Sequence, residues 1–359
     1  MGRMILNVLI LTAQRPRVFA RCLEAVEKSL HLVKQHANKM IPHLFVIDDS
    51  KDEFARKANR RAMNRIYLFE SAVYVERGLQ ANLVNSVIRK NKLKRSVGNR
   101  FFHPLGTKDV DVSAHRNLGV LAVREAGRST GLLWFVDDDI VVSHDELEGF
   151  TENLTKRVTP KLWGPKLKGI VDESSLERLL RSVGLDPQFG FHLDEKYLSG
   201  GCMFVDFDIA RRVPFPRLYN EDWIFQSIVQ KLYNVSPVFS KGSVYHLPGT
   251  NPINGDIGWI KRELDGDVMI DAINEARNNQ TISVRWIEQK KREIYELLME
   301  QERTIIMLNK MSRRGDLTSV MRKVRMSLDH LSNPDLPRRL HALYTQYRRD
   351  IQVWQRLMS

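Results

Sequence analysis

The stretch Leu132-Leu133-Trp134-Phe135-Val136-Asp137-Asp138-Asp139 places five apolar residues directly before three carboxylates. A short continuous apolar run is typical of a strand buried on both faces, as in a parallel sheet. Because unpaired charges are costly to bury, we expect this strand to end at Asp137. Ligands of open α/β sheets bind beyond the carboxyl ends of the strands. The stretch therefore predicts both a buried strand and a ligand site at its end.

The acids at the end of this strand suggest a metal site. In an extended chain Asp137 and Asp139 point to the same side, since side chains alternate. Two carboxylates there suit a hard divalent cation, Mg²⁺ or Mn²⁺, that also holds phosphate oxygens. The alternative is an acidic turn before a helix, because Ser143 and Glu146 have the spacing of a capping box.

The composition is that of an ordinary globular protein, with 359 residues, 43% of them hydrophobic and 28% charged. No apolar run has the length of a membrane span, and the first residues lead directly into a strand-like run, so we expect no signal peptide. Two cysteines provide no disulfide framework, which favours a reducing, cytoplasmic compartment. The net charge of +13 implies an anionic partner, such as a nucleotide diphosphate, a lipid headgroup or a nucleic acid.

Other parts of the chain repeat the pattern of a buried run that ends in polar residues. The run at 5–12 ends at Thr12, and the run at 44–47 ends at Asp48 and Asp49, with helical spacing between them. This alternation predicts an α/β fold with parallel strands joined by crossovers. From about residue 261 the pattern is helical. We therefore expect one domain over residues 1–260 and a helical extension over 261–359.

Four further motifs follow in order. Ala114-His115-Arg116-Asn117 opens a predicted helix with Ser113 as its N-cap and Gly127 at its end. Gly200-Gly201 precedes an apolar strand, where paired glycines permit either a close approach to a ligand or a bulge. Glu221-Asp222-Trp223 starts a helix, where acids are also favoured by the helix dipole alone. His246 ends a strand, and a lone histidine is usually structural.

Taken in this order, the motifs resemble the inverting family 2 type of glycosyltransferase with the GT-A fold, a mostly parallel central sheet flanked by helices. The resemblance covers roughly residues 4–248 and rests on segments 12–16, 47–50, 114–119, 137–139, 200–204 and 221–223. The chain departs from the family pattern in two places. The glycine expected after Asp49 is missing, and His115 is inserted before Arg116.

The resemblance implies a metal-dependent transfer of a sugar from a nucleotide-diphosphate sugar to an acceptor hydroxyl on a carbohydrate, a lipid-linked molecule or a protein. It implies Asp222 as the general base, with Glu221 as the fallback, and Asp137, Asp139 and His246 as metal ligands. The implied donor-binding residues are Thr12, Arg15, Asp48, Asp49, Arg116, Asp137, Asp138, Gly200, Gly201 and Trp223. The particular sugar, the base and the stereochemical outcome stay open.

Two alternatives remain, a nucleotidyltransferase and a non-catalytic nucleotide-binding protein. The turn at 12–16 has no glycine, which disfavours the phosphate loop of a nucleotidyltransferase and excludes the fingerprint of a Rossmann dehydrogenase. The Lys and Arg residues are dispersed and no nucleic-acid-binding motif occurs, so we expect no nucleic-acid partner.

The last 57 residues, 303–359, carry twelve Lys and Arg against four acids, an excess of eight positive charges. Apolar positions at helical spacing, including Ile305, Val320, Val324 and Leu328, predict amphipathic helices. Such helices either contact an anionic membrane peripherally, pack on the main domain, or form a homo-oligomer.

Overall fold

The structure is a computed structural model that describes residues 4–36, 40–102, 112–142, 152–154, 160–168, 180, 184–185, 197–218, 220–246, 257–276, 281–311 and 316–359. Ser143 and Glu146, the predicted capping box, lie outside the described residues.

The described strands form one eight-stranded sheet in the order β3-β2-β1-β4-β7-β6-β8-β5. The first four strands of that order are mutually parallel, β7 is antiparallel to β4 and β6, and β5 is antiparallel to β8. The predicted mixed α/β class with a mostly parallel sheet is therefore confirmed. The strands are β1 (Met4–Thr12), β2 (Met40–Asp48), β3 (Ser71–Glu76), β4 (Leu132–Asp137), β5 (Ile140–Val142), β6 (Leu162–Lys168), β7 (Cys202–Asp206) and β8 (Val238–His246).

The register of the central strands gathers the predicted site residues at one edge. Thr12 pairs with Asp48 of β2, and Leu11 pairs with Asp137 of β4. Strand β4 ends at Asp137, as predicted. Polar side chains that are more than a hundred residues apart in the sequence therefore meet at the carboxyl ends of β1, β2 and β4.

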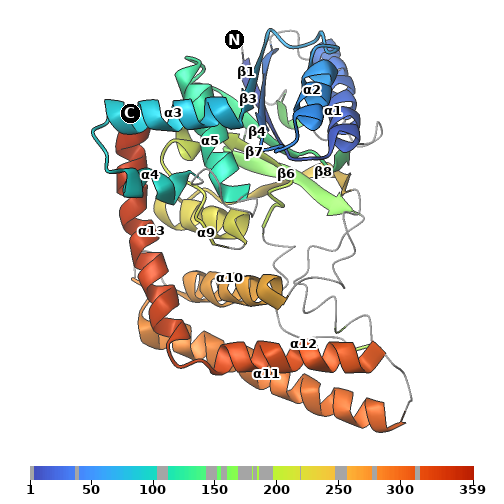
Figure 1. The fold of residues 1–359 in the computed structure, drawn as a ribbon, viewed down its shortest axis with the longest axis vertical. Helices are drawn as coiled ribbons and strands as arrows, with labels where there is room; N and C mark the ends of the chain where they lie inside the picture. Colours follow the sequence, from blue (N-terminus) through green and yellow to red (C-terminus); the bar gives the residue numbers. More distant parts are fainter. Residues whose placement is uncertain are drawn as a thin grey trace.

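Helices cover both faces of the sheet, because alternate residues of its central strands are apolar on both sides. One face, which includes Leu6, Val8 and Ile10 of β1, packs against α1 and α2. The other face, which includes Leu9, packs against α3 and α5 (Figure 1). These helices are α1 (Pro16–His36), α2 (Glu53–Met63), α3 (Arg77–Lys90), α4 (Arg95–Phe101) and α5 (Val112–Glu125).

The boundaries of α5 confirm one prediction and correct another. Gly127 follows the helix in a left-handed conformation with φ of 70°, as expected of a helix-ending glycine. Ser113 is not the N-cap, because it already lies within the helix and is buried there. The helix already includes Val112, so Ser113 lies in its first turn and packs inside the protein.

The remaining helices are α8 (Phe207–Ala210), α9 (Glu221–Tyr233), α10 (Ile257–Glu275), α11 (Val284–Met311), α12 (Asp316–Ser332) and α13 (Leu336–Met358). Helix α13 returns to the α/β part (Figure 1), where Trp354 Nε1 donates to Ala210 O at 2.9 Å and Tyr347 OH donates to Pro214 O at 2.7 Å. The apolar residues of the extension, Ile305, Val320 and Leu328 among them, are buried in the same core as α5 and α9. Helices α11 and α12 pack on each other and on α10, and α13 joins this group to the α/β part. The boundary near residue 260 stays a prediction.

None of the helices in the described part of the chain combines the length and the apolar character that crossing a bilayer requires.

Candidate active site

Arg15 and Thr12 hold the acids that follow β4. Thr12 Oγ1 donates to Asp138 Oδ2 at 2.7 Å. Arg15 forms an ion pair with Asp138, and its Nη1 lies 2.9 Å from Asp139 Oδ2. Residues 138–139 form a turn, so the extended alternation predicted to align Asp139 with Asp137 is wrong. Burial raises the pKa of Asp138 to about 7, although Arg15 and Thr12 act in the opposite direction.

The turn that carries Arg15 is fixed by its neighbour Gln14. Gln14 adopts a left-handed backbone conformation with φ of 58°, which is uncommon outside glycine. Its backbone N–H donates to Ser50 Oγ at 2.8 Å. This hydrogen bond joins the turn after β1 to the loop after β2. The turn in this position places Arg15 beside Asp138 and Asp139, which follow β4.

Asp48 lies at the predicted edge but faces the interior. It is fully buried and accepts hydrogen bonds from Ser50 N at 2.7 Å, from Asn59 Nδ2 at 2.9 Å and from Tyr74 OH. These bonds join β2, α2 and β3. The arrangement supports a structural role for Asp48 in shaping the loop that follows it.

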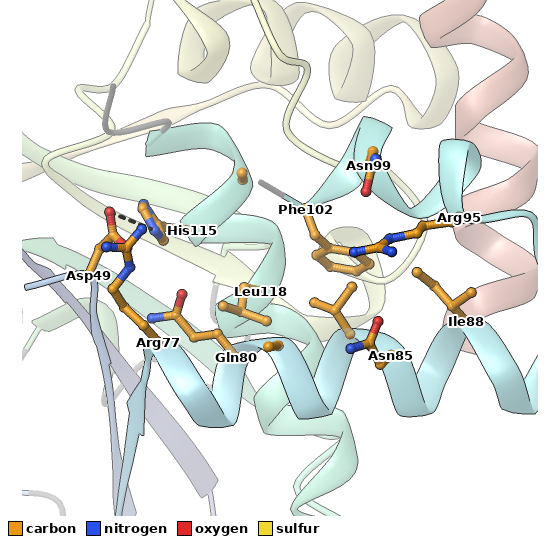
Figure 2. A pocket seen from close by; sticks show the side chains of 13 residues that line it. Asp49, Arg77, Gln80, Asn85, Ile88, Arg95, Asn99, Phe102, His115 and Leu118 are labelled. Atoms are coloured by element: carbon orange, nitrogen blue, oxygen red, sulfur yellow. Dashed lines mark ion pairs between the residues drawn. The ribbon is translucent and has the colours of Figure 1, made fainter. Parts of the chain in front are cut away.

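Asp49, the next residue, faces a cavity of about 190 Å³ between α3, α4 and α5 (Figure 2). Its Oδ1 lies 3.0 Å from Arg77 Nε, and its Oδ2 lies 3.9 Å from His115 Nε2. Sequence reasoning assigned no role to Arg77 or His115. The one available signal was that His115 interrupts the motif around Arg116.

Arg116 is the centre of a second cluster. Its side chain is 3% exposed, and its guanidinium lies 5.6 Å from the centre of the Phe215 ring. Nη1 forms an ion pair with Glu221, and Nη2 lies 3.4 Å from Asp137 Oδ2. Arg116 therefore links the end of β4 to the start of α9 from inside the protein.

The glycine pair allows this close packing. A Cβ atom on Gly200 would lie 2.6 Å from both terminal nitrogens of Arg116, which real contacts do not permit. A Cβ atom on Gly201 would lie 3.4 Å from Asp137 Oδ2. The side chains that approach the glycine pair closely in this structure are those of Arg116 and Asp137, and the approach of a ligand stays a prediction.

The predicted base, Asp222, is held at the start of α9. Its Oδ2 accepts from Gly200 N at 2.6 Å, and its Oδ1 accepts from Trp223 N at 3.0 Å. Burial raises the pKa of Glu221 to about 7; Asp222 and Asp137 add to that increase, and Arg116 opposes it. Both acids are half-buried, and Glu221 is paired with Arg116.

Trp223 is buried, with its ring stacked on Tyr197 at a centroid distance of 6.4 Å. Its indole N–H has no hydrogen-bond partner among the residues that the structure describes. The expected role of Trp223 as an exposed platform for a sugar would therefore require the surrounding side chains to move.

The metal ligands are only partly placed. His246 pairs with Ile140 through the backbone, and its side chain lies outside what the structure describes. Within the described ranges, no group of three or more His, Cys, Asp or Glu side chains surrounds a point where a metal could bind. The carboxylates of Asp137 and Asp139 still fit Mg²⁺ chemically, because this ion commonly takes one or two carboxylates and completes its shell with phosphate oxygens.

The fold is similar, at low sequence identity, to solved glycosyltransferases of the GT-A type. The structure of glucosyl-3-phosphoglycerate synthase from Mycobacterium tuberculosis, in complex with Mg²⁺ and uridine diphosphate, is 13% identical, with a TM-score of 0.46 over 74% of this chain and 79% of that one. Mouse xyloside xylosyltransferase 1 is 12% identical, with a TM-score of 0.33 over 66% of this chain and 78% of that one. The galactosyltransferase LgtC, bound to donor and acceptor sugar analogues, is 15% identical, with a TM-score of 0.28 over 67% of this chain and 72% of that one.

No family model and no curated protein matches the chain. Likenesses at these TM-scores carry no argument about activity, so the functional assignment rests on the site itself.

Proposed function

We propose that the chain is a glycosyltransferase that moves a sugar from a nucleotide-diphosphate sugar to an acceptor hydroxyl, with inversion. The observation that carries this proposal is the meeting of three remote segments at Arg116: the end of β4, the Gly200-Gly201 turn and the start of α9. Through Arg116, the start of α9 is joined to the end of β4. The first carries the candidate base Asp222, and the second carries Asp137, which is proposed to hold the donor.

Each group has a role in this proposal. The donor diphosphate lies at the carboxyl ends of β1 and β4, beside Asp137, Asp139 and Arg15. A divalent cation bound by Asp137 and Asp139 would neutralise charge that develops on the leaving diphosphate. His246 is the third proposed ligand. Asp49 is better placed than Asp48 to contact the nucleoside, because it faces the cavity.

The position of Asp222 at the start of α9 supports the following reaction. The acceptor hydroxyl attacks the anomeric carbon while Asp222 takes its proton. The bond from the anomeric carbon to the phosphate oxygen breaks, and its electron pair leaves with the nucleoside diphosphate. The backbone N–H of Gly200 holds one oxygen of Asp222, which fixes the carboxylate in position.

The test is the release of nucleoside diphosphate from a panel of nucleotide sugars, with water as the acceptor and with or without Mn²⁺. We expect one donor to raise the melting temperature and to be hydrolysed slowly. Asp222→Asn should lower kcat about 10²–10⁴-fold, the usual contribution of a general base, and leave the donor-induced shift intact.

Asp329→Asn is the matched control, because Asp329 is an exposed acid on α12 far along the chain from the site. It should keep full activity. Donor binding with unchanged turnover in both Asp222→Asn and Glu221→Gln would reject the inverting mechanism. A panel in which no nucleotide sugar stabilises the protein would reject the function.

A further inference from the structure

The outer surface of the α1–α2 layer carries cations that have no ion-pair partner in the part of the chain that the structure describes. On α1, the exposed positions follow helical spacing through Arg17, Arg21, Glu24 and Lys28. On α2 and just beyond it, Arg61 and Arg65 are exposed at the same spacing. Among the described residues, none of Arg17, Arg21, Lys28, Arg61 or Arg65 makes an ion pair or a side-chain hydrogen bond.

Two aromatic side chains accompany these cations. Phe54, in the first turn of α2, is 75% exposed, and Tyr67, four residues beyond the end of α2, is 85% exposed. Tyr67 is held there, because its backbone N–H donates to Glu27 Oε1 of α1 at 2.8 Å. We call the five cations with Phe54 and Tyr67 the α1–α2 patch.

The patch is a single surface. Helices α1 and α2 lie side by side on the same face of the sheet (Figure 1), and their buried sides share one core. Lys34 Nζ donates to Leu68 O at 2.8 Å, which fastens the loop after α2 to α1. The acids on and beside this surface are Glu24, Glu27, Asp52, Glu53 and Glu70. Of these, Glu53 is paired with Lys57 at 2.8 Å, and Glu27 accepts from the backbone N–H of Tyr67.

We propose that the α1–α2 patch docks on an anionic lipid surface. Unpaired cations gain from an anionic surface because they lose no protein partner on binding, and each one near such a surface adds to affinity. Exposed aromatic rings partition into the headgroup region of a bilayer, where their apolar bodies leave water. A folded protein that exposes two such rings beside five unpaired cations presents both components of interfacial binding at once.

The orientation of this docking follows from the topology. Helix α1 starts at Pro16, just after the carboxyl end of β1, and α2 starts at Glu53, just after that of β2. Arg17 and Phe54 therefore lie at the end of the patch nearest to the candidate active site. A membrane bound there would run beside the mouth of the site, which suits an acceptor embedded in that membrane. The docking itself does not depend on the proposed reaction.

The experiment is sedimentation of the full-length chain with vesicles of phosphatidylcholine and phosphatidylglycerol in equal parts, and with phosphatidylcholine alone. We expect binding to the anionic vesicles only, reversed by high salt. The triple variant Arg21→Ala, Arg61→Ala, Arg65→Ala should lower the partition coefficient about a hundredfold. Phe54→Ala should lower it several-fold without changing the net charge.

The matched control removes the same charge elsewhere. The variant Arg322→Ala, Arg338→Ala, Arg349→Ala deletes three exposed arginines of α12 and α13, and it should bind vesicles as the unaltered chain does. The proposal is overturned if the chain stays in the supernatant at low salt, or if the control loses binding as much as the patch variant. Preference for a single-stranded oligonucleotide over the vesicles would also overturn it. Since donor binding is measured separately in solution, failure of either proposal leaves the other to its own test.

Discussion

Gly200 shows how one missing side chain decides the geometry of the candidate site. The guanidinium of Arg116 lies against the backbone of Gly200, between Asp137 of β4 and Glu221 of α9. A Cβ atom at this position would require the buried guanidinium to shift. The glycine therefore serves the packing of a buried charge at least as much as any ligand.

Gly200→Ala should force Arg116 out of place and break its pairs with Asp137 and Glu221. We expect a loss of about 1–3 kcal/mol in the free energy of unfolding, as is usual for overpacking, together with a loss of donor turnover. Denaturant unfolding measures the first effect. Gly78→Ala is the control, because nothing lies within 4 Å of the added Cβ atom on α3, so this variant should be neutral or slightly more stable. Equal stability of the two variants would contradict the crowding argument.

Helix α13 is the element that ties the C-terminal extension to the α/β part. Trp354 packs against Phe101 of α4 at a centroid distance of 5.4 Å and donates to Ala210 O beyond β7. Asp350 of the same helix forms an ion pair with α4, with its Oδ1 2.8 Å from Arg100 Nε. The helix that carries part of the excess positive charge is thus built into the support of the site.

Trp354→Ala should cost about 3–5 kcal/mol of stability, because it removes a fully buried aromatic side chain and a hydrogen bond. Gln352→Ala, on the exposed side of the same helix, should change stability by less than about 0.5 kcal/mol. Thermal and denaturant unfolding of the two variants compare them directly. A small effect of Trp354→Ala would mean that α13 is only loosely attached.

At this scale the sequence predicts elements better than it predicts roles. The end of β4 was predictable, because an apolar run is followed directly by three acids and a buried strand cannot continue through unpaired charges. Helices α3 and α4 were not, because residues 77–102 lack a clear period. The role of Asp48 was also beyond the sequence, since its partners Asn59 and Tyr74 come from two other elements. Burial of Trp223 depends in the same way on Tyr197, which no local pattern connects to it.

For the whole molecule, the core is continuous from the sheet to the C-terminal helices. Residues of β4, α5, α9, α10, α12 and α13 belong to one buried cluster. The extension and the α/β part bury apolar surface against each other. In either part alone, that surface would be exposed to water.

We therefore expect the full chain to unfold in a single cooperative transition, and a chain shortened to residues 1–300 to lose its fixed tertiary structure. Calorimetry and near-ultraviolet circular dichroism measure these properties. Two separate transitions in the full chain, or a shortened chain with a native spectrum, would contradict a shared core and favour an independent helical extension.

The pairing of Thr12 with Asp48 and of Leu11 with Asp137 has a consequence for how this protein can change over generations. Side chains in a strand alternate, so a shift of β1 by one residue would exchange the residues facing α1 for those facing α5. The same shift would move Thr12 and the turn of Arg15 out of reach of Asp138. Single insertions or deletions in β1 would therefore cause misfolding and be removed by selection. Changes in ligand preference are expected instead in the loops that follow the strands.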